Sequence, residues 1–381
     1  MRVVVIGGGV IGLSTAWELA RRGHHVSLLE RDQPGRATSW AAAGILPTAR
    51  LETATDAVER LRGISHAMYP AWCDELYANS GIDCGLRQNG GVYLASSPGE
   101  AASLVAGMSY QRDLGLDIIS LTPATLAALE PSLKTWAMSS QFKAATFSKD
   151  EWQVRPPDLL AALVAACRLA GVEINTSTTA SVVMEQADAV ATTMDSAGNV
   201  SVHHADWIIV CGGAWSGLIS QAFGLAQGII PVRGQMLLYR FDSPPLNRVV
   251  NEGHRYFVPR DDGHILVGSC EEEVGLVNGT TDEMLEPLAR WAQSMLPSLV
   301  GREPVKRWSG LRPGTFDGFP IIGTFPGIRN LQIASGHYRS GIHLAPATAR
   351  IVADDLEQVP GRPRWDEFGV GRFLIRHAER K

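Results

Sequence analysis

The sequence is poor in cysteine, and its cysteines follow no pattern. There are five in 381 residues, and no two of them form a C-x-x-C pair. An odd and scattered set is atypical of a disulfide framework and typical of a reducing compartment, so we expect a cytoplasmic protein without disulfide bonds. The five residues are Cys73, Cys84, Cys167, Cys211 and Cys270.

The sequence also lacks long apolar runs, an excess of charge and metal-ligand spacings. No apolar stretch reaches the roughly 20 residues of a membrane-spanning helix, so no membrane partner is expected. The 34 basic and 39 acidic residues give a net charge of −5, which gives no reason to expect nucleic acid as a partner. The pairs His24–His25 and His203–His204 are adjacent in sequence. On strands they would point to opposite faces, so we read them as surface histidines and expect no metal site.

Glycine, in contrast, forms a recognisable pattern near the N-terminus. Gly7, Gly9 and Gly12 have the spacing G-x-G-x-x-G. A short β-branched run precedes them, a helical pattern over 13–22 follows, and a second strand ends at Glu30. Strand, glycine turn, helix and acidic residue therefore lie where a dinucleotide-binding unit requires them.

Each of these residues has a physical role in such a unit. Gly7 permits the tight turn out of the strand, Gly9 lets the backbone approach a pyrophosphate, and Gly12 lets the helix pack closely on the sheet. The helix N-terminus offers N–H groups to the pyrophosphate, and Glu30 can accept hydrogen bonds from ribose hydroxyls. A glycine-rich turn without a ligand is the alternative. The motif alone does not separate NAD from FAD.

The rest of the chain alternates between two patterns. A helix followed by a strand over 154–175, and a buried strand over 207–211 that ends at two glycines, are typical of an α/β sheet. Residues 51–135 read as mostly helical. Residues 229–270 alternate apolar and polar residues around an Asp-Asp-Gly turn at 261–263, which predicts an antiparallel hairpin.

This order predicts an α/β fold (α+β overall), in which a Rossmann-like nucleotide-binding domain is interleaved with a substrate domain built on an antiparallel sheet. The expected boundaries are 1–50, 140–217 and 308–357 for the nucleotide-binding domain, 51–139 and 218–307 for the substrate domain, and 358–381 for a C-terminal tail. This tail is basic after Pro360 and contains Trp365, Phe368 and Phe373.

Several stretches together carry a family resemblance. They are VVIGGGVIG with Glu30, SWAAAGIL, VCGGAWS, RYFVPR, GLRPGTFDGFPIIG and GHYRSGIHLAPAT. In this order, from residue 3 to about residue 357, they resemble the glycine oxidase branch of the D-amino-acid-oxidase-like flavoenzymes. The N-terminal motif is shared by many flavoproteins, whereas GLRPGT and GHYRSGI are far more specific.

The resemblance implies FAD as the cofactor and a small amine or amino acid as the substrate. It implies hydride transfer from the substrate Cα to flavin N5, with molecular oxygen as the usual acceptor and an imine and hydrogen peroxide as products. It also implies a homo-oligomer and a role in thiamine biosynthesis. The related sarcosine oxidases attach their flavin through a cysteine in the segment equivalent to GLRPGT. That segment has no cysteine here, so noncovalent FAD is expected.

Carried over by motif, the FAD-contacting residues lie in the N-terminal turn, the small-residue stretch after it, the glycines near 212, and the two specific motifs. They are Gly7, Gly9, Val10, Ile11, Gly12, Glu30, Arg31, Thr38, Ser39, Ala42, Ala43, Gly44, Ile45, Gly212, Trp215, Arg312, His337, Arg339, Ser340, Gly341 and Ile342.

The same resemblance places Arg312, Tyr256 and Arg339 at the reacting centre. In the family the arginine matching Arg312 binds the substrate carboxylate, and a guanidinium–carboxylate pair fixes orientation as well as charge. Tyr256 would donate its hydroxyl to the same carboxylate. No general base is assigned if the amine arrives neutral. A structural salt bridge for Arg312 and a sheet-packing role for Tyr256 are the alternatives.

The substrate pocket is expected to include Ile45, His254 and Glu271. Ile45 and Glu271 depart from the family, which often has methionine near the pocket, and Glu271 would attract a cationic amine if it faced the substrate. Other readings therefore stay open at this point. They are a flavin dehydrogenase that passes electrons to a carrier or quinone, an oxidase of sarcosine or a D-amino acid, an NAD-dependent dehydrogenase, and a nucleotide-binding protein without catalysis.

Overall fold

The fold is that of a computed structural model, which describes residues 1–194, 198–225 and 228–372. The helices are α1 (Val10–Arg21), α2 (Thr38–Ala41), α3 (Ala57–Ser80), α4 (Pro98–Asp113), α5 (Pro123–Leu129), α6 (Lys134–Ala137), α7 (Pro156–Leu169), α8 (Ser216–Ile219), α9 (Asp282–Met295) and α10 (Gly341–Leu356).

Four sheets are built from nineteen named strands of the described residues. The strands are β1 (Arg2–Ile6), β2 (His25–Leu29), β3 (Ile45–Leu46), β4 (Gly91–Ala95), β5 (Ile118–Leu121), β6 (Ala144–Ser148), β7 (Trp152–Gln153), β8 (Glu173–Asn175), β9 (Thr179–Glu185), β10 (Asp188–Met194), β11 (Val200–His203), β12 (Trp207–Val210), β13 (Ile230–Arg240), β14 (Val249–Glu252), β15 (Arg255–Pro259), β16 (His264–Gly268), β17 (Lys306–Gly314), β18 (Ile321–Thr324) and β19 (Leu331–Ser335).

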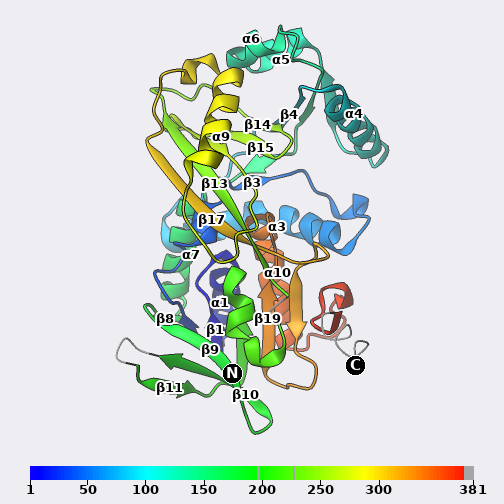
Figure 1. Cartoon of the computed structure of the whole chain (residues 1–381). Coiled ribbons are helices and arrows are strands. Elements are labelled where there is room, and N and C mark those ends of the chain that lie inside the picture. The colour runs from blue at the N-terminus through cyan, green and yellow to red at the C-terminus, as the bar shows by residue number, and fades with distance from the viewer. Residues whose placement is uncertain (195–197, 226–227, 373–381) are drawn as a thin grey trace, which may run out of the picture.

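The N-terminal unit lies at the centre of a six-stranded sheet with the order β18-β19-β12-β1-β2-β8. All neighbouring strands are parallel except β18, which pairs with β19 in the antiparallel direction. One face packs on α1, α3, α7 and α10, and the other packs on the three-stranded sheet β9–β11 (Figure 1). The carboxyl ends of β1 and β12 therefore meet at one edge, where open α/β sheets bind ligands.

The second large sheet has eight strands in the order β17-β13-β16-β15-β14-β4-β6-β5. Its neighbours are antiparallel except for the pair β14–β4. In Figure 1 its strands β13 and β17 run from the upper part of the molecule down to the nucleotide-binding unit. Helices α5, α6 and α9 contribute to the apolar core on one face of this sheet. The other face turns toward the cavity described below.

Register separates these two faces, because side chains directly opposite each other on paired strands share a face. One cross-strand row is entirely apolar and buried, and its members are Val92, Val250, Phe257, Val267 and Leu237.

The next row along the strands runs Tyr93, Asn251, Tyr256, Gly268 and Met236. It lies on the opposite face from the apolar row, because successive residues of a strand alternate between faces.

The structure confirms the predicted fold class and the hairpin around residues 261–263, which is formed by β15 and β16. Helix α1 begins at Val10, three residues earlier than the pattern predicted. The small sheet β9–β11 and strand β5 were not predicted. The domain boundaries stay a proposal, and strands β6 and β17, which fall inside the segments assigned to the nucleotide-binding domain, pair within the eight-stranded sheet.

The predicted tail is seen up to residue 372, and Phe373 lies outside the described residues. Phe368 is fully buried and stacks on Trp365 with ring centroids 5.4 Å apart. None of the helices among the described residues is long and apolar enough to cross a bilayer. The same residues contain no group of three or more His, Cys, Asp or Glu side chains that could hold a metal ion.

Candidate active site

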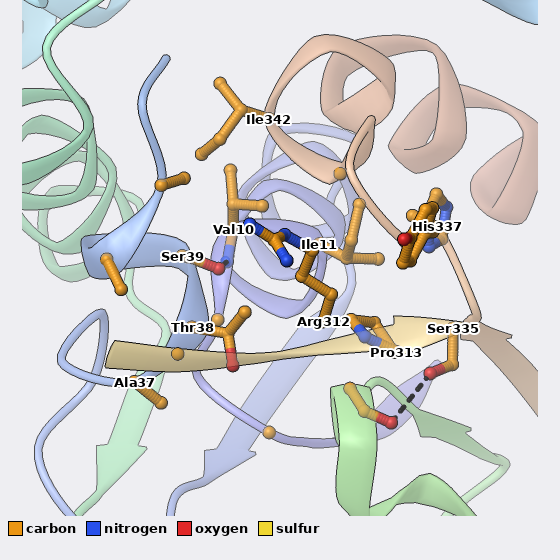
Figure 2. A pocket seen from close by; sticks show the side chains of 18 of the residues that line it. Val10, Ile11, Ala37, Thr38, Ser39, Arg312, Pro313, Ser335, His337 and Ile342 are labelled. Atoms are coloured by element: carbon orange, nitrogen blue, oxygen red, sulfur yellow. Dashed lines mark hydrogen bonds between the residues drawn. The ribbon is translucent and has the colours of Figure 1, made fainter. Parts of the chain in front are cut away.

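A cavity of about 660 Å³ runs from the glycine turn to the eight-stranded sheet. Its volume lies within the range of roughly 300–1,000 Å³ that is typical of cofactor and ligand sites. Figure 2 shows side chains from distant parts of the sequence around it. The labelled ones include Val10 and Ile11 from α1, Thr38 and Ser39 from α2, Arg312 and Pro313 from β17, and Ile342 from α10.

The glycine turn has the shape that a pyrophosphate needs. Gly7 has φ +108°, and a Cβ on it would lie within 2.8 Å of the carbonyl carbon of Cys211. A Cβ on Gly12 would clash with the carbonyl oxygen of Gly7. A Cβ on Gly9 would meet only the Ser39 hydroxyl, at 3.3 Å, so the backbone there is open to the cavity. Two glycines thus pack the turn, and the third leaves room for a ligand.

Hydrogen bonds fix the loops on both sides of this turn. The Ser39 hydroxyl accepts from the N–H of Val10 at 3.0 Å, at the start of α1. The Glu30 carboxylate accepts from the N–H groups of Gly8 (2.7 Å) and Asp32 (2.8 Å), one at each oxygen. Each carboxylate oxygen has a second lone-pair site, so Glu30 is held in place and can still accept from a ribose.

Beyond Glu30, Arg31 and Trp215 close this end of the cavity. The Arg31 guanidinium lies 4.6 Å from the centre of the Trp215 ring. Both residues line the cavity. A planar guanidinium stacked on an indole offers two flat surfaces, which suits an adenine ring or the backbone close to it.

At the other end, helix α10 begins at Gly341 and directs its N-terminus toward the cavity. Two buried residues of α3 fix this end, because Ser65 donates to the carbonyl of His343 at 2.6 Å and Tyr69 donates to the carbonyl of Ile342. His337 precedes the helix and contacts Thr348 at 3.1 Å. Burial lowers the pKa of His337 to about 3, so it is neutral. The helix dipole therefore contributes positive potential without a charged histidine.

Arg312 belongs to β17, and its guanidinium lies over the neighbouring strand β13. Two of its nitrogens are held by hydrogen bonds. Its Nη1 donates to the carbonyl of Cys270 at 3.1 Å, and its Nη2 donates to the hydroxyl of Ser269 at 2.6 Å. A Cβ on Gly234 of the neighbouring strand would overlap the guanidinium. The glycine thus provides the space in which Arg312 lies, and the arginine retains N–H donors that can serve a ligand.

Tyr256 lies on the same face of the sheet as Arg312, lines the same cavity and is 8 % exposed. Its hydroxyl is 3.5 Å from the sulfur of Met236. A thioether is a weak acceptor, so this contact leaves the hydroxyl available for a stronger one. Gly268 keeps the space open, because a Cβ there would be 2.5 Å from both Met236 Sδ and Tyr256 Cε2.

Arg339 is paired with Glu271. Its Nε and Nη2 both donate to Glu271 Oε1, at 2.8 and 2.6 Å, and the Tyr338 hydroxyl donates to the same oxygen at 2.5 Å. Burial acts in the opposite direction, but the hydrogen bond from Tyr338 and the charge of Arg339 lower the pKa of Glu271. Glu271 is therefore ionised, and its Oε1 accepts from both Arg339 and Tyr338.

Nearly all of the residues predicted to contact FAD line this one cavity, together with Tyr256. Gly12, His254 and Glu271 do not line it. Gly12 lies behind the turn, His254 is exposed, and Glu271 faces Arg339. The expectation that His254 and Glu271 belong to the substrate pocket is thus not supported by their positions.

Other residues that line the cavity were not predicted from the sequence, among them Arg62, Tyr93 and Asn251. Arg62 comes from α3, whose sequence shows no chemical pattern, and its Nη2 donates to Ser340 at 3.4 Å. Tyr93 and Asn251 lie on strands that are far apart in sequence, and only the pairing of β4 with β14 brings them together. No local signal could have identified them.

Comparison with known proteins agrees with this geometry. Residues 2–355 match the family model described as FAD dependent oxidoreductase. The chain is 36% identical over 354 residues to a glycine oxidase of Pseudomonas aeruginosa, covering 93% of this chain and 94% of that one. It is 31% identical over 391 residues to the bifunctional protein ThiO/ThiG of Trichormus variabilis, covering 97% of this chain and 55% of that one.

A solved structure shows the same fold. It is the crystal structure of glycine oxidase from Geobacillus kaustophilus, with a TM-score of 0.88 and 31% identity, covering 97% of this chain and 98% of that one. The match over almost the whole chain establishes the cofactor class as FAD and the enzyme class as an amine or amino-acid oxidoreductase. The chain belongs to the D-amino-acid-oxidase-like family of FAD-dependent oxidoreductases.

Proposed function

We propose that this enzyme oxidises glycine, or an amine or amino acid of similar size, and passes the electrons to molecular oxygen. The products are an imine, which hydrolyses to an oxo acid and ammonia, and hydrogen peroxide. The observation that carries the proposal is the position of Arg312 and Tyr256 together at the sheet end of the FAD cavity. A carboxylate held there lies beside the space open to the cofactor.

The residues present fit FAD. Gly7, Gly9 and the start of α1 would hold the pyrophosphate, Glu30 the adenosine ribose, and the N-terminus of α10 the flavin. The only described cysteine that lines the cavity is Cys211, at the pyrophosphate end. Noncovalent attachment is therefore part of the proposal. When bound, FAD accepts the hydride of the substrate Cα–H at N5.

Arg312 and Tyr256 orient the substrate. Arg312 is fixed through Ser269 and Cys270, so its free N–H donors have a constant direction. With the Tyr256 hydroxyl they provide three or more donors for one carboxylate. Such a clamp acts through positioning, because it holds Cα at a defined place relative to the cofactor.

The environment of Glu271 favours a substrate with a single amine. The carboxylate already accepts three hydrogen bonds from Tyr338 and Arg339, and it does not line the cavity. Its charge is balanced by Arg339 and it lies outside the cavity lining, so it is not placed to attract a second cationic group, as a diamine would require. Sarcosine and small D-amino acids remain the alternative substrates within this reading, and a dehydrogenase that reduces a carrier or quinone is the alternative reaction.

The cellular setting is also part of the proposal. All five cysteines are free and buried, which suits a reducing compartment and supports a cytoplasmic location. A homo-oligomer is proposed on family resemblance alone. The relative named ThiO/ThiG supports a role in supplying the imine of glycine to thiamine biosynthesis.

The visible spectrum of the purified protein tests this function. We expect a yellow protein whose flavin band is bleached by glycine without oxygen and restored by air, with release of peroxide. Acid precipitation should release the flavin into solution. Bleaching by sarcosine or a D-amino acid but not by glycine would replace the substrate. Bleaching by glycine that air does not reverse, but a quinone does, would replace the oxidase by a dehydrogenase.

A further inference from the structure

Glu151 is a buried carboxylate directly behind the cavity wall. It lies in the turn between β6 and β7 and is fully buried. The Tyr93 hydroxyl donates to its Oε2, and Asn251 Nδ2 donates to its Oε1 at 3.1 Å. Tyr93 and Asn251 both line the cavity. The carboxylate is thus separated from the substrate space by one phenol and one amide.

The sheet is built to admit this carboxylate. Gly91 lies two residues before Tyr93 on β4, so both residues face the same side. A Cβ on Gly91 would overlap the Glu151 carboxylate. The carboxylate therefore occupies the place where other residues would have a side chain.

The charges around this pair are few. Glu151 forms no ion pair with a cation in the part of the chain that the structure describes, and its polar contacts come from Tyr93 and Asn251. The charged group that faces Tyr93 from α3 is Arg62. Burial raises the pKa of Glu151 to about 7, although both hydrogen bonds oppose the rise. The group can hold or release a proton near neutral pH.

The proposed reaction needs such a group. In neutral water the amine of an amino acid is an ammonium ion, which has no lone pair to assist departure of the Cα hydride. Arg62, Arg312 and Arg339 cannot accept a proton. Glu271 is paired with Arg339 and does not line the cavity, and His337 is held neutral in a buried contact with Thr348.

We propose that Tyr93 and Glu151 form a proton relay that deprotonates the substrate ammonium. The ammonium N–H bond breaks as its proton passes to the phenol oxygen of Tyr93. The phenol proton passes to Glu151 Oε2, which becomes a carboxylic acid. Tyr93 is unchanged at the end, the amine is neutral, and no other reactant is consumed. This inference rests on the proposed function and assigns it the missing base.

The distances within the sheet suit a small substrate. Tyr93, Asn251 and Tyr256 occupy one row on three adjacent strands, so the backbones of the two tyrosines are roughly 10 Å apart. Their long side chains both extend into the cavity. A molecule of the size of glycine can then contact the carboxylate clamp with one end and Tyr93 with the other.

The test compares Glu151→Gln and Tyr93→Phe with wild type over a range of pH. If the pair removes the ammonium proton, kcat/KM of each variant should fall by about 100-fold near pH 7, the usual scale of general-base catalysis. The loss should shrink toward none at about pH 10, where the substrate amine is neutral in solution. Glu130→Gln is the matched control, because Glu130 is a buried carboxylate bonded to Asn247 and Arg248 and does not line the cavity.

A second measurement needs no turnover. We would record infrared difference spectra of the holoenzyme on binding 2-aminoisobutyrate, an amino acid without a Cα–H. Wild type should gain the band of a protonated buried carboxyl group, and Glu151→Gln should not. Variants that lose activity by the same factor at every pH, or a band that survives in Glu151→Gln, would overturn the relay. A wild-type flavin that glycine does not reduce at any pH would count against the proposed function instead.

Discussion

Gly234 should control the substrate clamp without controlling stability. In Gly234→Ala the new methyl group would lie 2.6 Å from Arg312 Nη1 and closer still to Cζ and Nη2. Non-bonded carbon contacts are normally about 3.5–4.0 Å, so the guanidinium must move by about 1 Å or more. The end of a long side chain can move that far at little cost in folding free energy, but the clamp then loses its position.

A misplacement of about 1 Å can cost on the order of 100-fold in rate. We therefore expect kcat/KM of Gly234→Ala to fall by about 100-fold, while the melting temperature stays close to that of wild type. The dissociation constant of glycolate, a carboxylate without an amine, should rise by a similar factor when followed through the flavin spectrum. Gly107→Ala is the control, because nothing lies within 4 Å of a Cβ at that position of α4. If Gly234→Ala kept both constants within about threefold of wild type, Arg312 would not bind the carboxylate.

Three further perturbations have defined outcomes. Arg312→Lys keeps the charge but loses the planar fork of the guanidinium. Its kcat/KM should fall by about 10–100-fold, the equivalent of one charge-assisted hydrogen bond. Arg255→Lys, on the other face of β15, is the control and should not change kcat/KM. Glu271→Gln frees Arg339, and because the pair is partly exposed, glycolate should bind no more than about fivefold tighter in a titration. His337 has a folded-state pKa lowered to about 3, so stability is lost as pH falls through the unfolded-state pKa of about 6.5. Between about pH 7 and about pH 5, wild type should therefore lose about 2 kcal/mol more unfolding free energy than His337→Gln. Denaturant titrations at the two pH values measure this difference.

Local patterns sufficed for the parts of the fold that depend on neighbouring residues. The strand–glycine–helix unit was visible because its turn, helix and acidic end lie within thirty residues. The hairpin of β15 and β16 was visible for the same reason. The sheet β9–β11 was missed because β9 and β11 contain few buried residues and the buried residues of β10 are mostly consecutive, so none of the three strands shows a clear alternation.

Residues of the site could be predicted only where they belong to a motif of the family. Arg312, Tyr256 and Arg339 came from the family resemblance, since no spacing rule places them in one cavity. Glu151 and Tyr93 are 58 residues apart and meet only through the pairing of β4 with β6 and β14. The ion pair between Glu271 and Arg339 could not be predicted either, because neither residue's neighbours in the sequence indicate it.

The two rows of the eight-stranded sheet separate the chemistry of this enzyme from its folding. Val92, Val250 and Phe257 stabilise the sheet from one side. Tyr93, Asn251 and Tyr256, each the next or previous residue in the chain, line the cavity on the other. Selection for a new substrate can therefore act on every second residue of these strands and leave the intervening hydrophobic residues untouched. A lineage built on this sheet can change what it oxidises in single substitutions without first acquiring spare stability.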